Sequence, residues 1–241
     1  MLATALSASI VGVDGVPVRV EVDVAFGLPG LTIVGLAGSA VLEARERVRA
    51  ALRNSGFEVP SRRITVNLAP ADLPKEGSHY DLPIALGLMA AIGAIPSDAL
   101  QGFTVVGELG LDGSLAPVAG VLPGAVAANA LGHGLICPKA CGAEAAWASP
   151  EMDILAPASL IQLVNHLRGK LLEQIAAPDG PGMKLLRDAA DAMRLSARGY
   201  HRVLKVARTI ADLDGAETIG RAHLAEALAY RSVNDRMAAA A

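Results

Sequence analysis

Residues 74–81, Pro-Lys-Glu-Gly-Ser-His-Tyr-Asp, bring a hydroxyl, an imidazole, an amine and two carboxylates into one short segment. Groups of these types can form an activated nucleophile, in which a base takes the proton of the attacking hydroxyl. Ser78 is the candidate nucleophile. A catalytic triad requires convergence in space, however, and sequence neighbours rarely point at one another. We therefore interpret the segment as a structural or binding loop and keep a serine peptidase as the alternative.

An arginine-rich stretch is the second candidate for chemistry, because guanidinium groups bind phosphates. Residues 1–169 contain 10 Lys and Arg residues, and six of these lie between residues 45 and 63. The candidate DNA contacts are Arg45, Arg49, Arg53, Arg62 and Arg63. On a helix, Arg45, Arg49 and Arg53 lie along one flank, and Arg62 and Arg63 lie at the start of the next predicted strand.

The charge balance leaves a second interpretation of these arginines open. Residues 1–169 also contain 15 acidic residues, which gives a net charge of −5, and residues 170–241 carry 11 basic and 9 acidic residues, which gives +2. Neither part has the strong basic excess of a dedicated nucleic-acid domain. The arginines also fit a solvated, ion-paired helix face, so any DNA binding through them is expected to be weak and electrostatic.

Nucleotide and metal motifs are missing from the sequence. A P-loop requires G-x4-G-K-[ST], but Gly169-Lys170 is followed by Leu171 and lacks the earlier glycine. Cys137 and Cys141 are the only thiols, and a C-x3-C spacing without a second ligand pair does not predict a zinc site. The histidines show no i,i+4 pairing that would favour a metal. We therefore expect no cofactor and no metal in this chain.

The elements that position these residues alternate between strand and helix patterns over residues 1–168, which predicts one α/β domain with a mixed sheet. Val18, Val20, Val22 and Val24 alternate with charged residues as in a half-buried strand. Strands are also predicted near the N-terminus and at 31–34, 63–68, 135–138 and 153–155, with a hairpin over 103–118 that turns at Asp112-Gly113. Helices are predicted at 41–54, 81–92, 121–131 and 159–168, and Asp81 is expected to cap the second of them. In the first of these helices, one apolar stripe is formed by Val41, Ala44, Val48, Ala51 and Leu52.

A different pattern follows residue 168. Residues 169–182 contain the breaker cluster 178–182, Pro-Asp-Gly-Pro-Gly, which predicts a linker. Residues 183–236 show no strand pattern and predict a small all-α bundle, with helices at about 183–194, 197–213 and 221–231. Ser196 is the predicted N-cap of the middle helix, whose basic face could meet the phosphates of ATP or DNA or could simply be solvated.

The composition excludes several classes of protein. Apolar residues make up 52% of the chain and charged residues 19%, which excludes disordered and collagen-like classes. The longest apolar candidate for a membrane span, 82–96, is short and is interrupted by Pro83, Gly87 and Gly93. The N-terminus lacks the positive region of a signal peptide. We therefore expect a cytoplasmic protein with no membrane partner.

Two regions carry a resemblance to a known family. Residues 27–91 read GLPGLTIVGLAGSAVLEARERVRAALRNSGFEVPSRRITVNLAPADLPKEGSHYDLPIALGLMAA, and residues 105–123 read VVGELGLDGSLAPVAGVLP. Both resemble the N-terminal domain of the YifB/ComM family of magnesium-chelatase-like AAA+ proteins. Residues 195–215, LSARGYHRVLKVARTIADLDG, and 223–231, HLAEALAYR, resemble the C-terminal helical lid of that family. The resemblance covers most of the chain.

The resemblance implies a fold and an activity. The family's first domain is similar to ribosomal protein S5 and to the proteolytic domain of Lon, and an AAA+ ATPase core with both Walker motifs lies between that domain and the lid. This chain lacks the core, so it resembles an internally deleted member, natural or engineered, joined near Gly169-Lys170. The family is expected to form hexameric rings that use ATP and Mg²⁺ to drive DNA branch migration in recombination and competence.

The same comparison implies roles for single residues. Ser78 lies near the nucleophile of the Lon-type Ser-Lys dyad, but Leu122 stands where its lysine would fall, so no peptidase activity is expected. Arg198 matches the sensor arginine that reaches the γ-phosphate of ATP and is the remnant of a nucleotide site. We therefore expect a chain that is no enzyme as it stands and keeps homo-oligomer assembly and weak DNA contact. The alternatives are a serine peptidase using Ser78 and a pure assembly module.

Overall fold

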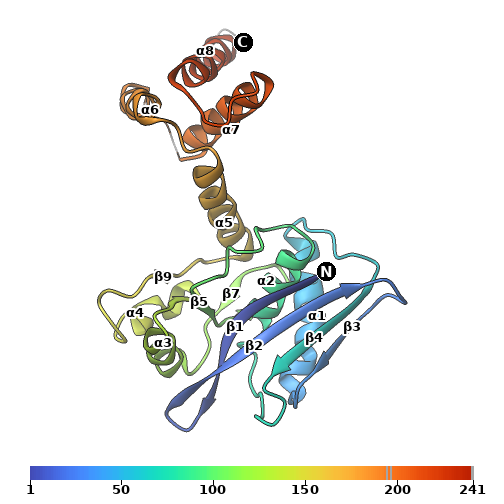
Figure 1. Ribbon diagram of the computed structural model, residues 1–241. Coiled ribbons are helices and arrows are strands. Elements are labelled where there is room, and N and C mark those ends of the chain that lie inside the picture. Colours follow the sequence, from blue (N-terminus) through green and yellow to red (C-terminus); the bar gives the residue numbers. More distant parts are fainter. Residues whose placement is uncertain (194, 196, 240–241) are drawn as a thin grey trace. The chain divides into compact units, whose positions relative to one another are not determined.

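The structure is a computed structural model that describes residues 1–193, 195 and 197–239, with the side chains of 169–175, 197–198 and 231–239 left out. The chain divides into two compact units, 1–167 and 168–241, and each is described by itself (Figure 1). Among the described residues, no helix combines the length and the apolar character needed to cross a membrane. Ser196, the predicted N-cap, lies outside the described residues.

The first unit is built on a seven-stranded mixed sheet in the order β3-β4-β2-β1-β5-β8-β9. The strands are β1 (Leu2–Val11), β2 (Asp14–Ala25), β3 (Gly30–Val34), β4 (Arg63–Ala69), β5 (Phe103–Val105), β8 (Gly134–Ile136) and β9 (Ile154–Leu155). β1–β2 and β2–β4 pair antiparallel, whereas the four other pairings are parallel. The α/β class and the mixed sheet predicted from the alternating patterns are confirmed.

Helices cover the sheet on both faces, and the buried valines of β2 belong to the large hydrophobic cluster of one face. On one face, α2 (Asp81–Ala91) packs on β1 and β2, and α1 (Ser39–Asn54) packs against α2 and β3. A Cβ on Gly87 of α2 would lie 2.8 Å from Cγ2 of Val22, so glycine permits this close approach. On the other face, α3 (Val121–Ala130) contacts β1 and β2, and α4 (Gly142–Ala145) packs beside it.

The predicted helical stripe and strand faces are confirmed in the first unit. The buried residues of α1 are those of the apolar stripe: Val41, Ala44, Val48, Ala51 and Leu52. The valines predicted to face the core from β2 are buried, as are the apolar residues of β4. Helix α2 is different, since all eleven of its residues are buried and it shows no polar face.

Three local predictions in the first unit are wrong in detail. Residues 103–109 are not one strand, because β5 joins the large sheet and only β6 (Glu108–Leu109) pairs with β7 (Leu115–Ala116) as a hairpin. Asp81 is the first residue of α2 and not its cap, since its carboxylate accepts from Arg47 and from the Leu109 N–H. Helix α5 (Leu160–Ile175) extends past the predicted end at residue 168.

The second unit contains α6 (Gly180–Ala192), α7 (Ala197–Leu213) and α8 (Arg221–Ala239) around a small apolar core. Val203, Ala207 and Ala211 of α7 form the buried stripe expected from the helical pattern. The breaker cluster has a more specific role than a linker, because Asp179 accepts the N–H of Gly182 at 2.7 Å and Pro181 occupies the first turn of α6. These residues begin a helix, since a capping carboxylate and an early proline both favour helix entry.

Candidate functional site

The loop between β4 and α2, residues 70–81, is held in place by its own polar groups. Lys75 is completely buried, and its Nζ donates to the carbonyl of Pro70. Its backbone N–H donates to the carbonyl of Leu36, and its carbonyl accepts from the N–H of Gly38. Burial lowers the pKa of the Lys75 ammonium, with Asp72 opposing that shift. The amine therefore hydrogen-bonds within the loop, to Pro70, and not to Ser78.

Ser78 is half-buried at the end of this loop, and its hydroxyl donates to the carboxylate of Glu108. The neighbouring imidazole is not its hydrogen-bond partner, since Nε2 of His79 donates to the carbonyl oxygen of Ala8 at 2.9 Å while the Ser78 hydroxyl donates to Glu108. The sequence placed Ser78, His79 and Lys75 together, but the structure gives each of them a different partner. The Ser78 hydroxyl therefore has no lysine or histidine partner of the kind that activates a serine.

A leucine, Leu122, occupies the position where the resemblance places a catalytic lysine. Leu122 lies in the first turn of α3, and its backbone N–H donates to Oε1 of Glu144 at 3.1 Å. A leucine side chain has no proton to exchange. The geometry at Ser78 and the residue type at Leu122 point in the same direction, toward a fold that holds Ser78 beside a carboxylate and without the lysine or histidine of the common serine dyads.

Two aromatic residues beside Ser78 fill the core and do not face a ligand. The rings of His79 and Tyr80 lie 4.2 Å apart between centroids, and both side chains are buried. Burial lowers the pKa of His79 and raises the pKa of Tyr80 to about 12. Both side chains therefore stay neutral over the physiological range, which suits a packing role better than proton transfer.

A two-pronged ion pair in the first unit joins α1 to α2. Nε and Nη2 of Arg47 donate to the two carboxylate oxygens of Asp81 at 2.6 and 3.0 Å, and Asp81 is completely buried. Asp81 also accepts the N–H of Leu109, and Arg47 donates to the carbonyl of Ala40. The hydrogen bond to Asp81 raises the pKa of Arg47, so this guanidinium keeps its charge in the interior. This two-pronged geometry is typical of strong Arg–carboxylate pairs.

Sequence reasoning missed this pair, although a signal was present. Arg47 lies four residues after Glu43, and that expected ion pair does form at 3.5 Å. At about 100° per residue, Arg47 borders the buried stripe on the flank opposite Arg45, Arg49 and Arg53. An arginine bordering a buried stripe needs an acidic partner, but the sequence alone does not say which one.

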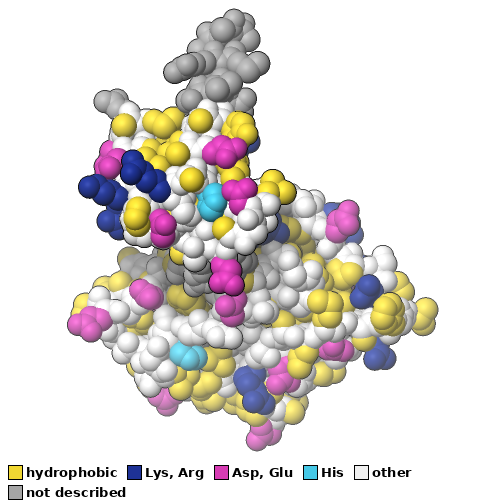
Figure 2. Space-filling view, turned by 45° about the horizontal axis from the view of Figure 1, so that its top comes forward, with side chains coloured by type: hydrophobic (Ala, Val, Ile, Leu, Met, Phe, Trp, Pro, Cys, Tyr) yellow, Lys and Arg dark blue, Asp and Glu magenta, His cyan; other side chains and the backbone are white. Residues whose placement is uncertain are grey.

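The five candidate DNA-contact arginines lie on two elements. Arg45, Arg49 and Arg53 belong to α1, and Arg62 and Arg63 lie at the start of β4. Only Arg45 has an acidic neighbour in reach, with Glu46 Oε1 at 3.7 Å from its Nε. The described residues place no carboxylate within 4 Å of the other four. On the face drawn in Figure 2, acidic and basic side chains are interspersed over the first unit.

The basic face of α7 in the second unit is only partly described. The side chain of Arg198, the expected remnant of a nucleotide sensor, lies outside the described residues. Arg202 and Lys205 are described, and Lys205 is exposed. Arg208 is committed to its own unit, because it donates to Asp212 at 2.9 Å and to the carbonyls of Ala216 and Glu217.

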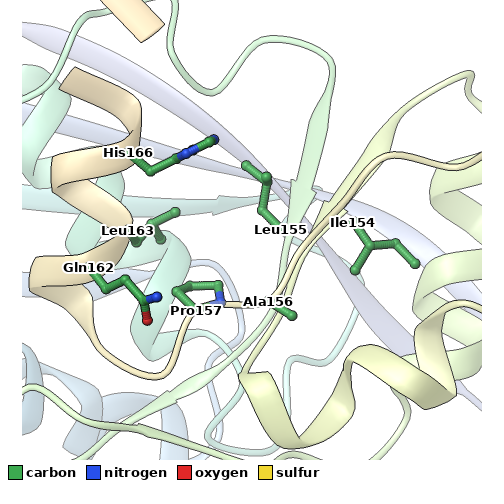
Figure 3. A pocket seen from close by; sticks show the side chains of 7 residues that line it. All are labelled: Ile154, Leu155, Ala156, Pro157, Gln162, Leu163 and His166. Atoms are coloured by element: carbon green, nitrogen blue, oxygen red, sulfur yellow. The ribbon is translucent and has the colours of Figure 1, made fainter. Parts of the chain in front are cut away.

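Two cavities lie among the described residues of the first unit. One of about 190 Å³ lies between β9 and the start of α5 and is lined by Ile154, Leu155, Ala156, Pro157, Gln162, Leu163 and His166 (Figure 3). Its polar side chain Gln162 already accepts the N–H of Ala158 at 2.8 Å. A wider hollow of about 640 Å³ includes His133, Glu151 and Asp153. Neither brings together the charged groups that would hold a nucleotide.

No cluster of three or more metal-ligating side chains occurs in the described part of the chain. Cys137 and Cys141 are both free thiols and both buried. Burial raises the pKa of Cys137 to about 12, which disfavours the thiolate that binds metals. The two cysteines instead pack in the cluster between α3 and the sheet.

Comparison with known proteins identifies two matched regions. Residues 20–141 match the family model described as subunit ChlI of Mg-chelatase, and residues 156–231 match that described as magnesium chelatase, subunit ChlI C-terminal. Only residues 142–155 separate the two regions. The first match alone covers half of the chain and includes the second half of β2, the loop with Ser78 and all five candidate arginines.

Several curated proteins are similar to this chain in sequence. The uncharacterised protein YifB of Salmonella typhimurium is 39% identical over 215 residues, which cover 85% of this chain and 42% of that protein. The competence protein ComM of Haemophilus influenzae is 44% identical over 169 residues, which cover 70% of this chain and 33% of ComM. An uncharacterised protein of Mycobacterium tuberculosis is 35% identical over 238 residues, which cover 94% of this chain and 46% of that protein. The chain spans less than half the length of these relatives.

Proposed function

Because this chain belongs to the ChlI-type magnesium chelatase family of AAA+-like proteins, we propose that it is a member without catalytic activity that contributes assembly and weak DNA contact. The observation that carries the proposal is the close succession of the two matched regions, with residues 142–155 between them. A P-loop is absent from the sequence, so no backbone cradle for phosphates is available. Assembly here means association with other copies of this chain or with full-length family members.

The loss of catalysis is argued separately for ATP and for peptides. Phosphate affinity in AAA+ proteins depends on a glycine-rich loop, its lysine and Mg²⁺, and a single arginine such as Arg198 does not replace them. Peptide hydrolysis by Ser78 in the manner of the Lon-type dyad requires a lysine beside the hydroxyl, and the hydroxyl donates to the carboxylate of Glu108 instead. ATP and Mg²⁺ are therefore proposed as cofactors of longer relatives and not of this chain.

We predict that isothermal titration calorimetry with ATP and Mg²⁺ detects no saturable binding at micromolar concentrations. We also predict that a fluorophosphonate probe fails to label Ser78, because an unactivated serine reacts too slowly. A known serine hydrolase provides the positive control for the probe. Micromolar ATP binding contradicts the first half of the prediction, and labelling that disappears in Ser78→Ala contradicts the second.

The proposed DNA contact rests on the arginines of α1 and β4. Arg49, Arg53, Arg62 and Arg63 have no carboxylate in ion-pair range among the described residues, so their charges are available to phosphates. Such contacts position nucleic acid without reading its sequence. The net negative charge of residues 1–169 opposes binding, which is why the affinity is expected to be low and steeply dependent on salt.

We predict that log K for duplex DNA falls with log salt with a slope of about −3 to −4.5, which corresponds to three to five phosphate contacts at roughly −0.9 each. Changing Arg45, Arg49 and Arg53 together to Ala reduces the affinity and brings the slope closer to zero. Arg19→Ala is the matched control, since Arg19 is an exposed arginine in the same unit already paired with Glu21 at 3.6 Å. The measurement is fluorescence anisotropy across a salt series with duplex and forked DNA.

Two results contradict the DNA part of the proposal. If the triple variant binds with unchanged affinity and slope, the helix α1 arginines make no contact. If the unaltered protein binds no DNA even at low salt, DNA contact is excluded and the pure assembly module becomes the better account. Sedimentation of the same samples measures self-association independently of DNA.

A further inference from the structure

The turn between β2 and β3 exposes two large apolar side chains. Phe26 is 87% exposed and Leu28 is 89% exposed, although both come directly after a strand whose valines are buried. The chain contains only three phenylalanines in 241 residues. An aromatic ring that could stabilise a core is instead held in water, and such a residue is a candidate for recognition.

Arg62, which directly precedes β4, and Arg63, the first residue of β4, adjoin this turn. The guanidinium carbon of Arg62 lies 4.8 Å from the centroid of the Phe26 ring. The Cβ of Arg63 lies 3.4 Å from the position that a Cβ on Gly27 would take. Both arginines are exposed. We call Phe26, Arg62 and Arg63 the ring platform.

The positive charge of the ring platform is not neutralised by its neighbours. On the adjoining strand β2, Asp23 is bound at 3.3 Å by the amine of Met1. Glu21 accepts from Asn67 at 2.8 Å and lies 3.6 Å from Arg19. The described residues place no carboxylate within 4 Å of Arg62 or Arg63. The surface therefore combines an exposed aromatic ring with two available cations.

We propose that the ring platform binds single-stranded DNA by stacking one base on Phe26 while Arg62 and Arg63 hold the adjacent phosphates. An aromatic ring beside arginines is the combination that binds unpaired bases without reading sequence. A base inside a duplex has both faces covered by its neighbours, so the stacking contact requires a single strand. Arg62 lies over the ring and can remain there while a base covers the opposite face.

This inference rests on the proposed DNA contact. It adds a preference for single-stranded DNA and a further contact residue, Phe26. The salt-dependent contacts from α1 treat duplex and single strand alike, since they engage only phosphates. The stacking contact at Phe26 adds affinity for the single strand alone. The two contributions are therefore separable by the form of the DNA and by the variant.

The test is fluorescence anisotropy with a labelled oligothymidylate and a labelled duplex of equal length, at low salt and across a salt series. Phe26→Ala is expected to weaken single-strand binding by roughly 5- to 150-fold, the range found for stacking on an aromatic residue. Its salt slope and its duplex binding stay unchanged. Phe26→Trp retains the affinity because it keeps a larger π surface. Leu28→Ala is the matched control, since it removes an equally exposed apolar side chain that has no ring.

The outcomes distinguish the ring platform from the electrostatic DNA contact on which it rests. If Phe26→Ala binds oligothymidylate as tightly as the unaltered protein, the ring platform is wrong while the electrostatic contact stands. If the unaltered protein binds neither DNA at low salt, both are wrong. If Phe26→Ala weakens single-strand binding but the α1 triple variant does not, the ring platform is supported and the α1 contact is refuted. Arg63→Gln is expected to bring the single-strand slope closer to zero by about 0.7, and an unchanged slope removes Arg63 from the platform.

Discussion

Replacing Arg47 by leucine is expected to accelerate the exchange of the buried amides of α2 by roughly two to almost four orders of magnitude, because it leaves the Asp81 carboxylate buried without its cation. Asp81 is completely buried and takes two hydrogen bonds from Arg47. Breaking a buried ion pair from one side costs about 3–5 kcal/mol. Amide exchange is the suitable measurement, since α2 lies in the core of the first unit and its slowest amides report the opening of that unit.

Arg45→Leu on the same helix is the control, because its side chain is 54% exposed and its neighbour Glu46 is 75% exposed. The control is expected to change stability by less than about 1 kcal/mol, as exposed ion pairs do. Asp81→Asn in the Arg47→Leu background is expected to recover part of the loss, since a neutral amide is less costly to bury than an unpaired carboxylate. Equal exchange rates in Arg47→Leu and Arg45→Leu would show that the Arg47–Asp81 pair does not hold α1 and α2 together.

Gly35→Ala is expected to lower the unfolding temperature of the first unit by at least roughly 6–12 °C, which corresponds to about 3 kcal/mol for a unit of this size. Gly35 has φ +106, and a Cβ there would lie 2.2 Å from the carbonyl oxygen of Leu68. That oxygen belongs to the backbone of β4, so it cannot rotate away as a side chain can. The clash therefore forces β3 and β4 apart or displaces the Leu36–Gly38 segment that pairs with Lys75.

Gly12→Ala is the matched control in the same unit. Gly12 also has a positive φ, +64, but a Cβ there meets nothing within 4 Å. It should show only the cost of a left-handed backbone for alanine, about 1–2 kcal/mol. Scanning calorimetry of the two variants separates the two contributions. A Gly35→Ala protein that melts no lower than Gly12→Ala contradicts the close packing of this turn.

The periodic patterns of the sequence were sufficient to predict most of the first unit. The alternation of valines in β2 and the apolar stripe of α1 depend on the repeat of the backbone alone, and both are confirmed. Prediction was weaker where neighbouring segments have different partners. Residues 103–109 read as one strand, but β5 pairs with β1 and β8 whereas β6 pairs with β7. Pairing partners are set by long-range packing, which a local pattern does not record.

In the candidate loop too, the sequence indicates the residue types, and only the structure shows their hydrogen-bond partners. Ser78, His79 and Lys75 could be identified from the sequence as reactive groups, because residue types are known without a structure. Their partners Glu108, Ala8 and Pro70 are decided by the folded chain. The hydroxyl, imidazole and amine each satisfy a different acceptor. A buried polar group must find a partner nearby in space, whatever its distance along the chain.

The sequence by itself determined the residue types, the repeats of the elements, the absence of a P-loop and the leucine at position 122. Only the tertiary structure decided that Arg47 meets Asp81, 34 residues away, while Arg45 and Arg53 are exposed and Arg49 is half-buried. It alone placed Arg62 over Phe26 across the end of the sheet. The physical reason is that local pattern reports which face of an element is buried, whereas the pairing of charges and rings depends on which elements the hydrophobic core brings together.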